Sequence, residues 1–274
     1  GMGMTGIITK VKLKVLKLKS SHIKIYKKLE FSKLISVYNY LRKSKYVYNQ
    51  NNIFINYDKK KFIVARITSG DFFNKKFKNK MINNKKIYSF RFNFFKVPIL
   101  KKIIEKFILI KERILTKKIL HINEAFYPSN SRLLYFCLLG KKFIEHQTII
   151  PHANVKKFLN EFEKISKFNS PLITLCHFKI FNGSSKYLEF DGKGLAVSIH
   201  VAIDKSFHNF YTKYLKLNKR YNCVMNIYKN SLMDNRTIKL TYKIKYRNFL
   251  KEIRKINNKT IFVNNIFTKE NFYK

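Results

Sequence analysis

The sequence predicts an α+β fold in which a mostly antiparallel sheet is flanked by helices. Three observations support this fold class. Apolar residues make up 46% of the 274 residues and aromatic residues 16%, which is enough to build a folded core. Segments with alternating apolar residues are interspersed with segments whose apolar residues recur at helical spacing. In the second half, turn residues connect consecutive strand-like segments as in hairpins.

The first half opens with apolar and basic residues that alternate over 7–18, which predicts a half-buried strand. Helical spacing of aliphatic and aromatic residues predicts a helix over 31–42. The remaining predictions for this part are strands at 53–57 and 62–67, a turn containing Asp58 between them, and loops over 71–95.

Residues 97–118 form a strongly basic amphipathic stretch. It fits a helix that lies on an anionic membrane surface, or a helix with a solvated lysine face. We favour the second interpretation.

The second half is more regular. Proline at 151 separates a strand from a helix, and a Gly/Ser turn separates two later strands. The predicted order is strand 143–150, helix 153–166, strands 172–181 and 194–203, helix 205–217, a short strand at 223–228 and a final helix near 240–256.

The net charge is extreme: 58 basic and 15 acidic residues give +43. A surface this positive attracts polyanions, so an RNA-binding or ribosome-associated protein is the alternative function to consider. However, lysine greatly outnumbers arginine, and the lysines are spread along the chain without forming one basic arm. Abundant Lys, Asn, Ile, Phe and Tyr without Trp is typical of an AT-rich genome, so we do not expect a nucleic-acid partner.

Cysteine usage and hydropathy indicate a cytoplasmic protein. Cys137, Cys176 and Cys223 are far apart and lack the spacing of a zinc site, so we expect buried thiols in a reducing compartment and no metal. No apolar run reaches the roughly 18 residues of a membrane span, and the start lacks a signal-peptide pattern. Peripheral attachment to the inner membrane remains an option through 97–118.

Five segments carry motifs that occur together in one enzyme family. They are GMGMTGIITKVKLKV at 1–15, FIEHQTIIP at 143–151, FKIFNG and FDGKGLAVSIHVAI within 178–203, NIYKNSLM at 226–233, and the ending over 242–272. In this order they resemble the FAD-linked oxidases with a vanillyl-alcohol-oxidase-type fold. Within that family they resemble the decaprenylphosphoryl-β-D-ribose 2′-oxidases and the D-arabinono-1,4-lactone oxidases.

The resemblance implies a domain organisation. Residues 1–15 would end the FAD-binding domain, 16–222 would form the substrate-binding domain, and 223–274 would return to the FAD-binding domain. The chain would then be the C-terminal part of the enzyme, without any covalent flavin attachment site and inactive alone.

The resemblance also assigns cofactor and catalytic residues. Lys229 would lie against the flavin pyrimidine edge, where a cation stabilises negative charge at N1–C2=O. Lys179 would point toward the substrate or the flavin, and is the second catalytic candidate. The opening segment would bring its backbone close to the FAD through Gly3, Thr5, Gly6 and Ile7.

Four residues are expected at the substrate: Gln147, Lys179, Ser198 and Asn226. Several positions depart from the family pattern, and these departures put substrate identity in doubt more than reaction type. They are Ser198 for Cys, Leu195 for Trp, His200 for Asp, Asn226 for Tyr and Asn230 for an acid. We interpret His177 and His200 as polar strand residues and not as bases.

The implied function is an FAD-dependent oxidoreductase that oxidises a secondary alcohol of a sugar or polyprenyl-phospho-sugar to a keto sugar. Such a step would belong to the synthesis of cell-envelope polysaccharide precursors. An NAD(P)H-dependent reductase that completes an epimerisation is the partner that the resemblance implies.

Overall fold

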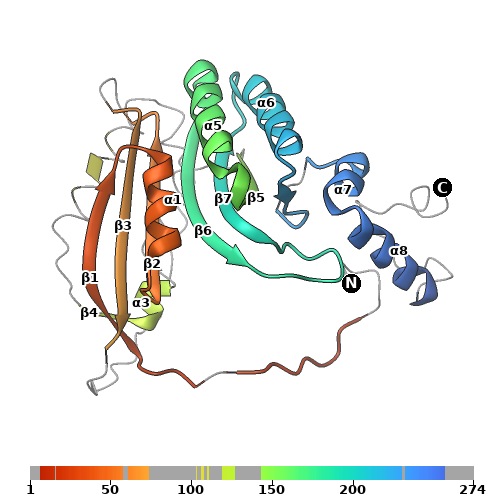
Figure 1. Ribbon diagram of the computed structural model, residues 1–274, viewed down its shortest axis with the longest axis horizontal. Helices are drawn as coiled ribbons and strands as arrows, with labels where there is room; N and C mark the ends of the chain where they lie inside the picture. Colours follow the sequence, from red (N-terminus) through yellow and green to blue (C-terminus); the bar gives the residue numbers. More distant parts are fainter. Residues whose placement is uncertain are drawn as a thin grey trace.

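The computed structural model describes residues 7–15, 17–57, 61–73, 103, 106–107, 110, 119–126, 143–229 and 232–256. They form two four-stranded sheets accompanied by helices (Figure 1). All strand pairings among these residues are antiparallel. The α+β class with mostly antiparallel pairing is therefore confirmed.

The first sheet has the strand order β2-β3-β1-β4. Helix α1 (Leu34–Lys43) packs on it, and its apolar side chains Leu34 and Val37 are fully buried. A register shift between Ile25 and Lys27 shows that β1 carries a bulge opposite β3. The strands are β1 (His22–Phe31), β2 (Tyr48–Ile55), β3 (Ile63–Phe72) and β4 (Ile119–His121).

The second sheet has the order β6-β7-β5-β8. Its strands are β5 (Phe143–Pro151), β6 (Ile173–Asn182), β7 (Lys193–Ala202) and β8 (Val224–Met225). After β5, a 3₁₀ turn (His152–Asn154) leads into α5 (Val155–Asn169), and α6 (Phe207–Arg220) follows β7. Aromatic side chains fix these helices against the sheet, because Phe158, Phe162, Phe210 and Tyr214 are all fully buried and in ring contact.

Asn51 connects the two sheets where the edge strands β2 and β6 run side by side (Figure 1). Its Nδ2 donates to the Phe178 carbonyl at 2.8 Å, and its Oδ1 accepts from the Phe178 N–H at 2.7 Å. The side-chain amide thus takes the place of a backbone rung in the ladder. One apolar core then runs beneath both sheets, from Leu34 to Cys223.

The C-terminal part of the described chain packs separately. Helices α7 (Asn235–Tyr242) and α8 (Ile244–Ile256) share a small apolar cluster with Leu188 from the β6–β7 hairpin. The prediction of one helix over 240–256 is wrong in its start and its continuity. Lys243 has φ 48°, which interrupts the helical path, and Asp234 caps α7 by accepting from the Thr237 N–H.

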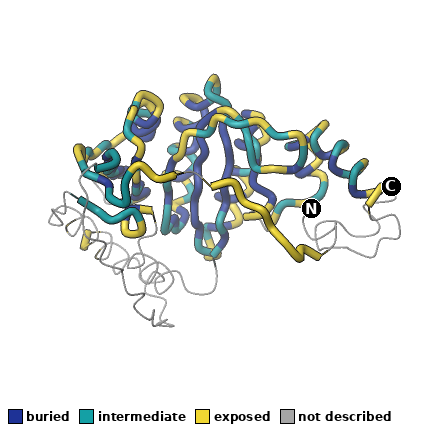
Figure 2. Tube along the Cα trace, turned by 90° about the horizontal axis from the view of Figure 1, so that it is seen from below, coloured by how far each residue is buried: buried dark blue, intermediate teal, exposed yellow. Residues whose placement is uncertain are grey.

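The prediction of a strand over 7–18 is also wrong for the described residues of this segment. None of them is in a strand, and the apolar side chains that alternate there are exposed, with Ile7 at 85% (Figure 2). A strand requires a hydrogen-bonded neighbour, and no described strand pairs with this segment. The first strand is instead β1, where we had predicted none.

Most other elements agree with the sequence to within a few residues. Strand β2 begins five residues before the predicted 53–57, and β8 has two residues where 223–228 was predicted. Strand β4 and helix α3 (Ile122–Phe126) were not predicted, and Asp71 and Phe72 continue β3. Of 97–118, residues 103, 106, 107 and 110 are described and are helical. The other predictions for this part of the chain lie outside the described residues; they concern Asp58, Cys137, 74–95 and the rest of 97–118. Cys176 and Cys223 are buried free thiols. Among the residues described, no helix has both the length and the hydropathy needed to cross a bilayer.

Candidate functional site

The second sheet presents a polar face on the side opposite its helices. Along β7, Leu195, Val197, Ile199 and Val201 belong to the apolar core. Side chains alternate along a strand, so Ser198 and His200 point to the other face. This face, which we call the polar face, also receives side chains from β5 and β6.

Strand register brings the polar residues together. In β5, Glu145 lies opposite His200 and Gln147 lies opposite Ser198. In β6, on the other side of β7, His177 also lies opposite Ser198. Directly opposed residues project on the same face of an antiparallel pair. The polar face therefore consists of Glu145 and Gln147 from β5, His177 and Lys179 from β6, and Ser198 and His200 from β7.

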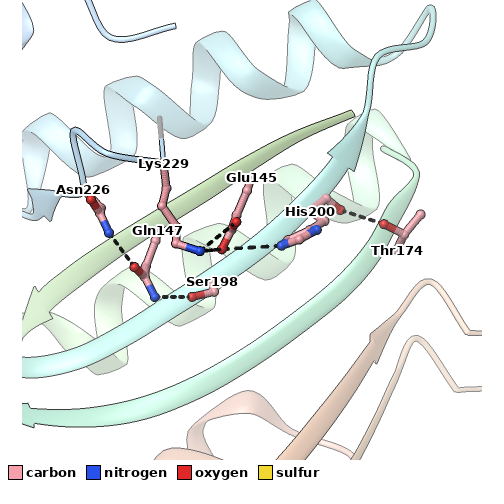
Figure 3. A network of polar contacts seen from close by, with 7 residues as sticks. All are labelled: Glu145, Gln147, Thr174, Ser198, His200, Asn226 and Lys229. Atoms are coloured by element: carbon pink, nitrogen blue, oxygen red, sulfur yellow. Dashed lines mark hydrogen bonds and ion pairs between the residues drawn. The ribbon is translucent and has the colours of Figure 1, made fainter. Parts of the chain in front are cut away.

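A hydrogen-bonded row crosses the polar face (Figure 3). Gln147 Nε2 donates to Ser198 Oγ at 2.8 Å, and Asn226 Nδ2 donates to Gln147 Oε1 at 2.7 Å. Asn226 is held in the turn after β8, where its N–H donates to the Gln147 carbonyl and its Oδ1 accepts from the Tyr228 N–H. All three side chains of the row are buried, Ser198 with 1% of its surface exposed.

A second group on this face is charged (Figure 3). Lys229 Nζ lies 2.9 and 3.0 Å from the two carboxylate oxygens of Glu145, and His200 Nε2 lies 3.5 Å from one of them. Burial by itself would raise the pKa of Glu145. Hydrogen bonds from His200 and Lys229, and their charges, outweigh burial and lower this pKa to about 2. Glu145 is therefore a carboxylate at any ordinary pH.

His177 is the residue of the polar face whose side chain is available to a ligand. Its ring makes no hydrogen bond to any residue of the described chain. Burial lowers the pKa of His177 to about 4, and interactions with Lys179, His200 and Lys229 act in the same direction, whereas Glu145 acts in the opposite direction. His177 is thus a neutral imidazole near pH 7, with a ring nitrogen able to accept a proton.

His146 belongs to the opposite face and is not part of this site. It is fully buried beside α6, with Nδ1 3.1 Å from the Tyr211 hydroxyl and its ring edge-on to Tyr214. Burial lowers its pKa to about 3, so it is a neutral core residue.

The structure brings most of the predicted site residues together. Gln147, Ser198 and Asn226 form the hydrogen-bonded row, and Lys229 reaches the same face through Glu145. Lys179 lies two residues beyond His177 on β6, with its side chain exposed. Of the predicted FAD contacts, Ile7 is solvent-exposed, and Gly3, Thr5 and Gly6 lie outside the described residues, as does Asn230.

Sequence reasoning missed Glu145. A signal was present, since Glu145 is two residues before Gln147 on a predicted strand and therefore shares its face. Its pairing with Lys229 had no such signal, because 84 residues separate the two. His177 and His200 were noted only as polar strand residues.

Chemically, the polar face offers hydrogen-bond donors and acceptors suited to hydroxyl groups, beside a cation held by a carboxylate. Within the described chain, no group of three or more His, Cys, Asp or Glu residues could hold a metal ion. No protein-family model and no curated protein matches the sequence.

Proposed function

We propose that this chain is part of an FAD-dependent oxidoreductase that oxidises a secondary alcohol of a sugar or polyprenyl-phospho-sugar. One observation carries the proposal. Three separate motifs supply Gln147, Ser198, and the pair Asn226 and Lys229, and these residues converge on one side of one sheet. Residues chosen for an unrelated reason would be expected to scatter over both faces.

The donor set of the polar face fits one edge of a flavin. Lys229 is a cation with 44% of its side chain exposed, while Glu145 holds the ammonium group in place. When bound, FAD would supply an acceptor for the hydride of the carbinol carbon, and negative charge would collect at N1–C2=O. Lys229 would stabilise that charge. Because the ion pair with Glu145 already orders the Lys229 side chain, less side-chain entropy would be lost when the flavin binds.

The remaining residues would bind and orient the sugar. Buried amide and hydroxyl groups bind a ligand that completes their hydrogen bonds much more tightly than one that does not. The reason is that a buried polar group left without a partner costs binding free energy. Lys179 is an exposed cation at the border of this face, suited to a phosphate on the substrate.

FAD titration tests the proposal most simply. The chain, alone and within any longer protein that contains it, is titrated with FAD and followed by flavin absorbance and fluorescence. We expect the FAD-binding form to be yellow, and Lys229→Met to retain FAD with weaker flavin reduction. A protein that stays colourless with added FAD in both forms would refute the proposal.

A second candidate, RNA binding, is favoured by one exposed surface. Tyr26 of strand β1 stacks with Tyr46 from the connection between α1 and β2, with ring centroids 6.1 Å apart. Lys24 Nζ lies 5.3 Å from the Tyr26 ring and Lys27 Nζ lies 5.8 Å from the Tyr46 ring. Aromatic rings with lysines are the usual means of binding single strands. Salt-dependent RNA binding that Tyr26→Ala and Tyr46→Ala abolish, by a protein without FAD affinity, would favour this function.

A further inference from the structure

All hydrogen bonds of the row on the polar face are donated in the same direction, from Asn226 to Gln147 and from Gln147 to Ser198, where the row ends. From this direction we infer that Ser198 and His177 form one hydroxyl-binding site, in which Ser198 donates a hydrogen bond to a ligand hydroxyl and His177 accepts the proton of that hydroxyl. The identity of the ligand as a sugar alcohol rests on the proposed function. The direction of the row does not.

The direction starts at a backbone group. The Tyr228 N–H, which can only donate, lies 2.9 Å from the side-chain oxygen of Asn226. The oxygen end of the Asn226 amide therefore faces Tyr228, and its NH₂ end faces Gln147. Turning this amide over would set two donors against each other in a buried place.

The orientation of the Asn226 amide determines that of the Gln147 amide. The Asn226 NH₂ group lies 2.7 Å from Gln147, so it must meet the carbonyl oxygen Oε1. The Gln147 NH₂ group then points to Ser198 at 2.8 Å, and Ser198 Oγ accepts. The hydroxyl proton of Ser198 is consequently directed away from Gln147. Among the described residues, Ser198 donates a hydrogen bond to none.

His177 stands on the other side of Ser198. It is its register partner across β6 and β7, so both side chains project from the same face, with Cβ atoms about 5 Å apart. The two form no direct hydrogen bond, and His177 is the less buried of the pair. An oxygen that enters beside His177 can accept from Ser198 and donate to the imidazole nitrogen. A hydroxyl group does both, whereas an ether or carbonyl oxygen only accepts.

This arrangement supplies a proton acceptor for the oxidation. Bound FAD would supply the acceptor for the hydride of the carbinol carbon. His177 would take the proton of the O–H bond as the C=O bond forms, and the imidazolium would later release this proton to solvent. The low pKa of His177 keeps the ring neutral before this step. Glu145 favours the protonated ring that follows, whereas burial and the nearby Lys179 and Lys229 oppose it.

Asn226→Asp tests the direction of the row. A carboxylate still accepts from the Tyr228 N–H but no longer donates to Gln147, so the Gln147 amide turns and Ser198 donates inward to Oε1. The full chain is titrated with D-ribose, and the NMR signals of the His177 ring are followed; no flavin is needed. We expect Asn226→Asp and Ser198→Ala each to weaken ribose binding about tenfold, the effect of one lost hydrogen bond. The double variant should be no weaker than either single one.

Asn235→Asp is the matched control, because it makes the same change outside the polar face, at the Tyr246 hydroxyl. It should bind ribose as the wild type does. Should Asn226→Asp fail to fold, Ser198→Ala and His177→Phe carry the test. Ribose that leaves the His177 signals unmoved, or binds equally to wild type, Asn226→Asp and Ser198→Ala, would overturn the inference. Ribose binding at His177 by a protein without FAD affinity would refute the proposed oxidase and leave this site intact.

Discussion

Replacing Glu145 by Gln should destabilise the protein at neutral pH and have little effect in acid. The carboxylate is bound by Lys229 at 2.9 Å and by His200 at 3.5 Å, and its pKa is lowered from 4.5 to about 2. A carboxylate with a depressed folded pKa adds stability above its unfolded pKa, and that stability is lost as pH falls through the folded value. The window for Glu145 is therefore about pH 4.5 down to pH 2.

The size of the effect follows from the same shift. About 2.5 pKa units correspond to at most about 3 kcal/mol in the free energy of unfolding. The side chains of Glu145 and Lys229 are 24% and 44% exposed, so solvent screening reduces this to about 1–2 kcal/mol. Gln keeps the shape and one acceptor oxygen, so the loss reports mainly the charge.

Urea denaturation of wild type and Glu145→Gln at pH 7 and pH 2.5 measures the effect. The difference between the two proteins should be full at pH 7 and only a small part of that at pH 2.5, which lies near the lower end of the window. Glu252→Gln is the control, because Glu252 pairs with the exposed Lys255 among the described residues, and its replacement should change stability by a few tenths of a kcal/mol. Equal stabilities at pH 7, or a difference that persists undiminished at pH 2.5, would refute the reasoning.

Three further predictions concern the fold. His146 is neutral in the folded core, with a pKa of about 3 against 6.5 for the free group. The free energy of unfolding should therefore fall as pH drops from about 6.5 to about 3. In denaturant titrations, His146→Leu should reduce this dependence on pH. Asn51→Ala removes both hydrogen bonds to the Phe178 backbone. We expect the free energy of unfolding to fall by about 1–3 kcal/mol and the Phe178 amide hydrogen to exchange faster. Unchanged exchange would contradict the conclusion that Asn51 connects the two sheets. Gly194→Ala would set a Cβ 2.0 Å from the Ile150 carbonyl oxygen and should cost about 1–3 kcal/mol in thermal melts, whereas a neutral effect would show that the strands can separate there.

The sequence predicted the helices and strands of the second half well, because local periodicity governs them. Helix α5, for example, repeats its apolar residues at helical spacing and begins soon after Pro151. The strand prediction over 7–18 was wrong, since alternation shows only that a segment could form a strand. Whether a partner strand is available depends on the rest of the fold.

The candidate site was predictable in its residues but not in its connections. Gln147 and Ser198 lie on recognisable strands, and alternation could have added Glu145 to their face. The contact of Asn226 with Gln147 depends on a turn after β8 whose two-residue strand carries almost no periodic signal. Tertiary packing also decides that Lys229 meets Glu145, and no spacing along the chain reports it.

Anaerobic reduction of bound flavin by a sugar alcohol tests the central claim most directly. The protein, loaded with FAD, is mixed without oxygen with pentoses and their polyprenyl-phospho derivatives, and the absorbance at about 450 nm is followed. We predict that one of these alcohols bleaches the flavin and yields a keto sugar, more slowly when the carbinol hydrogen is deuterium and more slowly in Lys229→Met. A protein that binds no FAD, or whose flavin stays oxidised with every sugar alcohol tried, would contradict the account.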